Sequence, residues 1–182
     1  MNKLVFCIVL VMFFFNASAQ NRFLTKDAKI KFNSSTPLED IVAESDQATT
    51  FIDIDKNEVA FSVLTTSFKF RRALMEEHFN ENYMESSKFP KAKFFGKIIP
   101  QIDWKSRKEL MANVKGELTM HGVSKEVTFN ARITPGNDKI TASAVLKITP
   151  EMFNITIPSA LRDKIAKEVT INIEAIYVPY NQ

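Results

Sequence analysis

The chain has 182 residues, a formal net charge of +3, 45% hydrophobic residues and a single cysteine, Cys7. Acidic and basic residues are interspersed, so the charge favours solubility, and we expect no nucleic-acid partner because no strong basic patch or known binding module occurs. Cys7 lies within the first nineteen residues. Disulfides, thiolate metal sites and a nucleophilic thiol are therefore excluded from the rest of the chain.

The N-terminus, residues 1–19, has the three-part pattern of a secretory signal peptide. One basic residue, Lys3, precedes an apolar run over residues 4–15, and the small-residue triplet 17–19 reads Ala-Ser-Ala. This run is shorter than the roughly 20 residues that cross a bilayer as a helix, and the triplet suits cleavage. We therefore expect no transmembrane anchor, cleavage after the triplet, and a periplasmic or secreted mature domain over residues 20–182.

The mature sequence alternates between apolar and polar residues along most of its length. This period of two places one set of side chains on a single face of a strand and predicts half-buried antiparallel strands. The alternating segments are 28–33, 59–63, 114–120, 127–133, 140–148 and 169–177. Further candidate strands are 41–45, 49–54 and 92–99. About eight or nine such strands in one domain favour a barrel or a sandwich.

One segment, residues 71–84, has helical spacing instead. Its apolar positions, with one histidine among them, are Leu74, Met75, His78, Phe79 and Tyr83. The spacing predicts one amphipathic helix, which we expect to cover an end or edge of the sheet. A shorter helical turn is predicted over residues 159–166, with Ser159 as its N-cap.

The ionisable residues form no catalytic or metal-binding pattern. The two histidines, His78 and His121, lie on different expected elements without metal-ligand spacing, so we expect no metal, no cofactor and no catalytic residue. His78 is interpreted as a hydrogen-bonded packing residue on the apolar helix face. His121, which precedes Gly122, is interpreted as a turn residue. Asp53 and Asp55 are interpreted as a solvated strand end.

Phenylalanine is frequent, with 16 residues in the chain. If about eight strands close into a barrel, inward side chains either fill the interior or leave a cavity for one apolar ligand. The residues leave both possibilities open, because an aromatic stripe is also typical of a packed core.

Two stretches of the sequence resemble the YceI-like family. The stretch 116–127 reads GELTMHGVSKEV, similar to the family's G-x-L-T-h-H/N-G-V-T/S-K-x-V hairpin. The stretch 77–96 ends in KFPKAKFFG, similar to the family's segment that ends in a P-x-A-x-F strand. The resemblance implies an extended lipocalin-like antiparallel barrel that holds a long isoprenoid or other amphipathic chain, usually in the bacterial periplasm. In one departure, residues 28–33 lack the histidine often found near the family's N-terminal strand.

We therefore predict a mainly β fold, a lipocalin-like antiparallel barrel of about eight strands with one amphipathic helix. The leading function is a periplasmic binding or carrier protein for an isoprenoid-like or fatty-acid-like lipid. The side chains expected to contact this ligand are Phe61, Val63, Phe94, Leu118, Phe129, Ala142, Ala144, Leu146 and the polar His78. Each assignment to the inner face depends on strand register.

Two other functions remain open at this stage. One is an envelope interaction module with a filled core that acts through its surface. The other is an enzyme on a lipocalin-like scaffold, for which Glu77, His78 and Tyr83 would be the first candidates for a polar cluster inside the barrel. A homodimer is compatible with the sequence.

Overall fold

The computed structural model describes residues 21–136 and 138–180, and the expected signal peptide, residues 1–19, lies outside the described residues. The strands are β1 (Arg22–Ser35), β2 (Asp40–Asp53), β3 (Glu58–Leu64), β4 (Lys69–Phe70), β5 (Lys91–Ile99), β6 (Leu110–Met120), β7 (Val123–Pro135), β8 (Ile140–Ile148) and β9 (Val169–Pro179). The helical segments are α1 (Ala73–His78), a π-helical turn η2 (Phe79–Tyr83), and the 3-10 turns η1 (Thr65–Ser67), η3 (Pro150–Phe153) and η4 (Ser159–Leu161).

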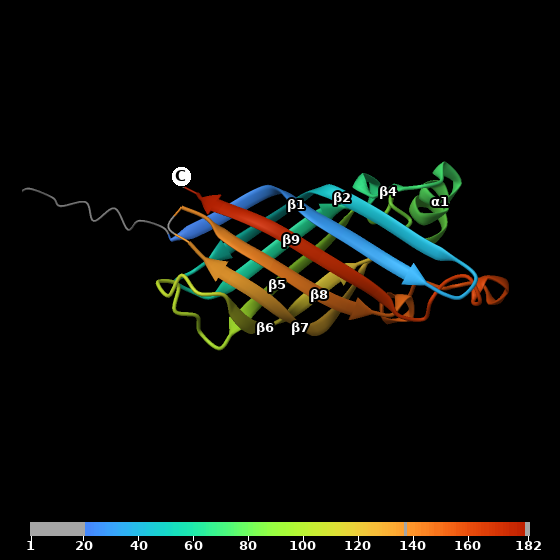
Figure 1. Ribbon diagram of the computed structural model, residues 1–182. Helices are drawn as coiled ribbons and strands as arrows, with labels where there is room; N and C mark the ends of the chain where they lie inside the picture. Colours follow the sequence, from blue (N-terminus) through green and yellow to red (C-terminus); the bar gives the residue numbers. More distant parts are fainter. Residues whose placement is uncertain (1–20, 137, 181–182) are drawn as a thin grey trace, which may run out of the picture.

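The strands form one antiparallel sheet that closes on itself. Its order is β1-β9-β8-β7-β6-β5-β3-β2, and β2 pairs again with β1, while β4 adds a two-residue strand to β2. Closure leaves the eight long strands without free edges, which removes the sites at which sheets pair with other chains. The predicted antiparallel barrel with one short helix is therefore confirmed for the described residues (Figure 1).

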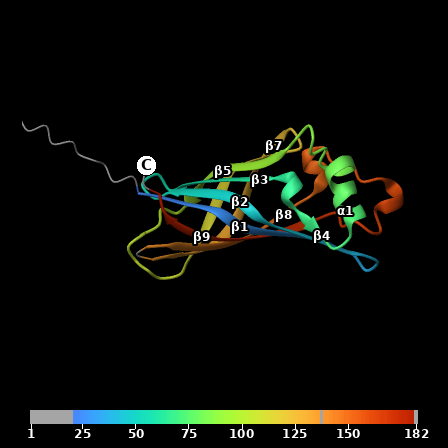
Figure 2. The same ribbon diagram turned by 90° about the horizontal axis from the view of Figure 1, so that it is seen from above.

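The barrel is elongated, and its two ends carry different connections. The segments with α1, η3 and η4 lie at one end, which we call the helix end (Figures 1 and 2). At the other end the two termini of the described chain lie side by side, because the Tyr180 backbone N–H donates to the Arg22 carbonyl at 2.8 Å. We call this second end the loop end, since it carries the β2–β3, β5–β6 and β7–β8 connections.

The alternation in the sequence corresponds to the inner and outer faces of the barrel. On β8, for example, Ile140, Leu146 and Ile148 are buried, whereas Val145 is 51% exposed. One strand differs from the prediction, because β2 runs unbroken where the sequence suggested two segments. Its pairing with β1 shifts at a bulge near residues 46–47, which are both exposed. A bulge inserts one residue and so interrupts the period of two.

The predicted helix is present, but its buried face is narrower than expected. Met75, Phe79 and Tyr83 are partly buried, whereas Leu74 is 59% exposed and His78 is exposed. The interpretation of His78 as a packing residue is therefore wrong. The helix packs against only one end of the barrel. Side chains next to those that contact the barrel, such as Leu74 and His78, therefore face water.

Two local interpretations of polar residues are also wrong. Ser159 does not cap η4, because Pro158 holds the N-cap position and no side chain caps this turn. Asp53 is not solvated, since its side chain is 8% exposed. It accepts hydrogen bonds from Arg22 Nε at 3.4 Å and from the Lys56 backbone N–H at 3.1 Å.

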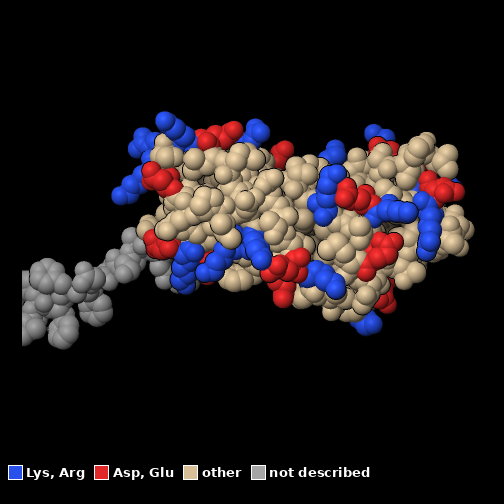
Figure 3. All heavy atoms as spheres, turned by 90° about the horizontal axis from the view of Figure 1, so that it is seen from below, with Lys and Arg blue, Asp and Glu red and all other residues tan. Residues whose placement is uncertain are grey.

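The outer surface has no single-sign face in the view of Figure 3, where basic and acidic side chains are interspersed around an uncharged central area. Among the described residues, no helix is long and apolar enough to span a membrane.

Candidate functional site

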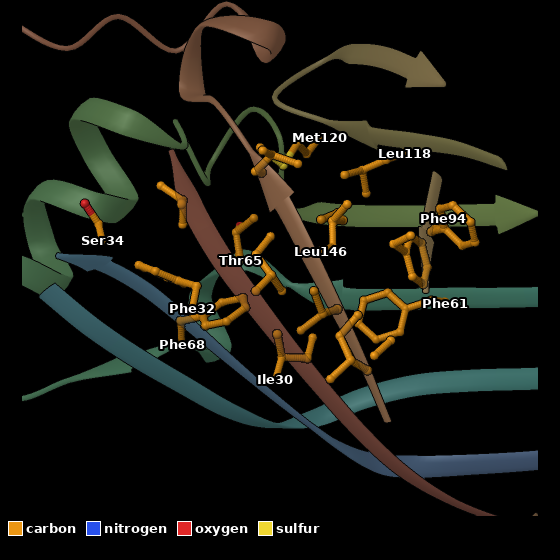
Figure 4. A pocket seen from close by; sticks show the side chains of 18 of the residues that line it. Ile30, Phe32, Ser34, Phe61, Thr65, Phe68, Phe94, Leu118, Met120 and Leu146 are labelled. Atoms are coloured by element: carbon orange, nitrogen blue, oxygen red, sulfur yellow. The ribbon is translucent and has the colours of Figure 1, made fainter. Parts of the chain in front are cut away.

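A cavity of about 370 Å³ lies inside the barrel. Every described strand contributes inward side chains to it, and most of these are apolar. The apolar side chains labelled in Figure 4 are Ile30, Phe32, Phe61, Phe68, Phe94, Leu118, Met120 and Leu146. The volume lies in the range of about 300–1,000 Å³ that is typical of small-molecule sites. The barrel interior is therefore not filled by its own side chains.

The structure brings all the residues expected at the ligand together around this cavity. Phe61, Val63, Phe94, Leu118, Phe129, Ala142, Ala144 and Leu146 line it from β3, β5, β6, β7 and β8. His78 lines it from α1, at the helix end, although the side chain is exposed. That these side chains contact a ligand remains a prediction.

A pair of glycines gives the Phe94 ring room against the wall. Gly96 on β5 lies directly opposite Gly116 on β6. A Cβ atom on Gly116 would lie 2.4 Å from the Gly96 Cα and 2.8 Å from the Phe94 Cζ, so neither glycine tolerates a side chain without a shift. The Phe94 ring occupies this space and contacts Phe129 at a centroid distance of 5.4 Å. The sequence pattern gave no signal for this arrangement.

Four phenylalanine rings pack together at the helix end of the cavity. Phe32, Phe68, Phe70 and Phe79 have centroid distances between 5.1 and 5.9 Å. We call this group the phenylalanine cluster. Sequence reasoning missed Phe68 and Phe70, because β4 has only two residues and shows no alternation.

Near the loop end, two polar groups of the cavity wall, Thr50 and Tyr177, bond to each other. The Thr50 hydroxyl donates to the Ala60 carbonyl at 2.9 Å, so the Tyr177 hydroxyl, at 3.1 Å, donates to Thr50 Oγ1. Burial raises the pKa of Tyr177 to about 12, although its hydrogen bond with Thr50 acts in the opposite direction. The phenol is therefore neutral at physiological pH.

His121 connects three segments at the helix end. Its Nδ1 lies 2.9 Å from the Phe153 carbonyl, and its Nε2 lies 2.8 Å from Glu85 Oε2. The predicted turn is present, with φ of 51° at His121 and 72° at Gly122. The two side-chain contacts tie the β6–β7 turn to η3 and to the segment that follows η2. They were not foreseen, because both partners are distant in sequence.

The acidic, basic and imidazole side chains that line the cavity also lie at the helix end. Glu39 precedes β2, His78 belongs to α1, and Lys164 belongs to the β8–β9 connection. Among the described residues, no group of three or more histidine, cysteine or acidic residues could hold a metal ion.

Comparison with known families gives a direct match for this chain. The sequence profile of the YceI-like domain matches residues 15–177. The chain belongs to the YceI-like domain family. The resemblance of the two motif stretches to this family is thereby confirmed.

Curated relatives match part of the chain. A UPF0312 protein of Pseudomonas putida strain GB-1 is 26% identical over 124 residues, which cover 64% of this chain and 62% of the relative. A UPF0312 protein of Pseudomonas fluorescens strain SBW25 is 35% identical over 78 residues, 42% of this chain and 38% of the relative. The matches thus span less than two thirds of the relatives' length.

Solved structures share the fold of this chain over most of its length. A polyisoprenoid binding domain from Saccharophagus degradans superposes with a TM-score of 0.76 at 13% identity, covering 88% of this chain and 99% of that domain. BcnA of Burkholderia cenocepacia superposes with a TM-score of 0.70 at 18% identity, covering 83% and 96%. At these identities the similarity shows the fold alone.

Proposed function

We propose that this protein is a periplasmic binding or carrier protein that holds an isoprenoid-like or other amphipathic lipid inside its barrel. The observation that carries the proposal is the cavity, with its apolar lining drawn from every described strand. The Saccharophagus degradans domain is described as polyisoprenoid-binding, which supports the same ligand class here. The periplasmic location rests on the signal-peptide pattern of residues 1–19.

The cavity size bounds how much of a lipid chain it would enclose. At about 30 Å³ for each water-sized group, about 370 Å³ accommodates roughly a dozen chain carbons. At about 0.8 kcal/mol for each buried CH2, their transfer from water contributes on the order of 10 kcal/mol before the costs of binding.

A filled-core interaction module is the weaker hypothesis, because such a protein has no need of an interior cavity. An apolar cavity of this size would also be costly to keep empty, since its lining lacks packing partners.

The test is native mass spectrometry of the mature protein purified from its own host's envelope, followed by lipid extraction. We expect a stoichiometric acyl or polyisoprenoid species. The double variant Ala142→Phe, Ala144→Phe places two rings in the cavity, so bound lipid should fall at least tenfold.

The matched control is Val145→Phe, which adds a ring on the outer face of the same strand. It should retain the lipid, and thermal unfolding should show that both variants fold. An apo mass for the parent protein, together with no uptake of added lipid, would sink the carrier proposal.

A further inference from the structure

The charges around the cavity are unevenly distributed. Near the loop end the wall is apolar apart from the bonded pair Thr50 and Tyr177 and from Ser143, and no charged side chain lines it among the described residues. At the helix end, Glu39 is neutralised by an ion pair with Arg72. Lys164 also lines the cavity there, and it has no ion pair with any described residue. The cavity lining at the helix end therefore offers one lysine charge, on an exposed side chain, that pairs with no described acidic group.

Tyr83 adds a hydrogen-bond donor to this end. It lines the cavity from η2, and its hydroxyl makes no hydrogen bond within residues 21–136 and 138–180. Burial raises the pKa of Tyr83, so the phenol keeps its proton at neutral pH. Tyr177 differs, because its proton is already donated to Thr50. Tyr83 can therefore donate to a group that enters the cavity.

The turn that carries Tyr83 is held in place by its neighbours. The Met84 backbone N–H donates to the Phe79 carbonyl at 2.8 Å and closes the wide π-helical turn. The Ser86 hydroxyl donates to Asn80 Oδ1 at 2.7 Å. Turns of this kind are frequent at functional sites. The donor is thus positioned before any ligand arrives.

The segment that carries Lys164 is also fixed. The Ala166 backbone N–H donates to Ser34 Oγ at 2.9 Å, and the Lys164 backbone N–H donates to the Leu161 carbonyl at 3.0 Å. Ser34 lies at the helix end of the cavity (Figure 4). The bond to Ser34 anchors the β8–β9 connection against β1, so the base of the Lys164 side chain stays beside the cavity.

We infer that the helix end is a headgroup site for an anionic amphiphile, in which Lys164 pairs with the headgroup charge and Tyr83 donates a hydrogen bond to a headgroup oxygen. The inference rests on the proposed function and adds the ligand's orientation and headgroup class. The tail points toward the loop end, and the headgroup is a carboxylate or phosphate. A neutral headgroup would leave the exposed Lys164 ammonium group paired with water alone.

The test compares three probes with the same twelve-carbon chain: dodecyl phosphate, dodecanoate and dodecanol. Delipidated mature protein is titrated with each, and displacement of the neutral dye N-phenyl-1-naphthylamine reports binding. A partly exposed ion pair contributes up to about 1 kcal/mol, so we expect about fivefold tighter binding of the two anions than of the alcohol.

Two variants and one control identify the groups responsible. Lys164→Gln should abolish most of the preference for anions. Tyr83→Phe should weaken the binding of every probe that accepts its hydrogen bond, and the loss of affinity should be largest for the two anions. Lys167→Gln removes an exposed lysine from the same β8–β9 connection. It should change neither the affinity for the probes nor the preference for anions. Melting temperatures should confirm that the variants are folded.

The outcomes separate the inference from the proposed function. Equal affinity for the alcohol and the anions, or an anion preference that survives Lys164→Gln, would overturn the headgroup site and leave the carrier proposal intact. Failure of the parent protein to bind any of the three probes would overturn both. An equal response of dodecyl phosphate and dodecanoate to the variants would support a site for anionic oxygen groups in general.

Discussion

The two ends of the barrel are closed by different interactions. At the loop end, Asn57 Oδ1 accepts hydrogen bonds from the Ile102 backbone N–H at 3.3 Å and from Trp104 Nε1 at 3.1 Å. At the helix end, the phenylalanine cluster packs instead, and Tyr83 and Lys164 line the cavity at the same end. Hydrogen bonds depend on geometry, whereas ring packing tolerates rearrangement. We therefore expect the loop end to stay closed and ligands to enter at the helix end.

The largest effect is expected from Asn57→Ala at the loop end. Asn57 is buried and has a φ of 51°. Alanine would leave the donors of Ile102 and Trp104 without their acceptor and would adopt the left-handed backbone unfavourably. Together these effects should lower the free energy of unfolding by about 2–4 kcal/mol, measured by urea denaturation.

Asn113→Ala serves as the control for this prediction, because Asn113 is exposed on the outer face of β6. The free energy of unfolding of this variant should stay within about 0.5 kcal/mol of that of the parent protein. A similar loss in both variants would show that the Asn57 contacts do not close the loop end.

A smaller effect is expected from alkaline pH, through Tyr177. Its pKa is raised from 10.0 to about 12 in the folded protein, so between these values the unfolded chain has released a proton that the folded chain keeps. The contribution of Tyr177 to the free energy of unfolding is then fully present below about pH 10. It falls by about 1.4 kcal/mol per pH unit up to about pH 12. Urea titrations at several pH values would measure this slope.

Tyr177→Phe removes this titration and should flatten the slope by the same amount, although other groups still titrate. The variant also loses the hydrogen bond to Thr50, which costs about 1 kcal/mol at neutral pH. An unchanged slope would contradict the burial of an ionisable phenol at this position.

The smallest effect is expected on the outer side of the helix. Leu74→Gln changes a side chain that is 59% exposed and should shift the free energy of unfolding by no more than about 0.5 kcal/mol. Phe79→Leu, five residues further along the chain and within the phenylalanine cluster, should lower the free energy of unfolding by about 1–2 kcal/mol through lost ring contacts. Equal losses would mean that the helix presents a broader apolar face than its exposure indicates.

The predictions from sequence succeeded where a residue's role depends on its neighbours along the strand. Period-two alternation places Phe61 and Val63 on one face whatever the partner strand is, and both line the cavity. The interpretations of His78 and Asp53 failed, because each depends on a partner or surface contributed by a distant segment. His78 lies outside the narrow contact line of the helix, and Asp53 is buried against Arg22.

By itself, the sequence determined the strand character of the chain, the inward positions, the helix and the YceI-like motifs, since local periodicity and short-range turn chemistry encode them. Only the tertiary structure decided whether the interior is filled or hollow. That outcome depends on the distance between opposite walls of the barrel and on the positions of rings such as Phe94, which packs against Gly96 and Gly116. The tertiary structure likewise brings Tyr83 and Lys164 to one end of the cavity. Barrel closure places these distant segments together, and no local sequence pattern indicates that they are neighbours.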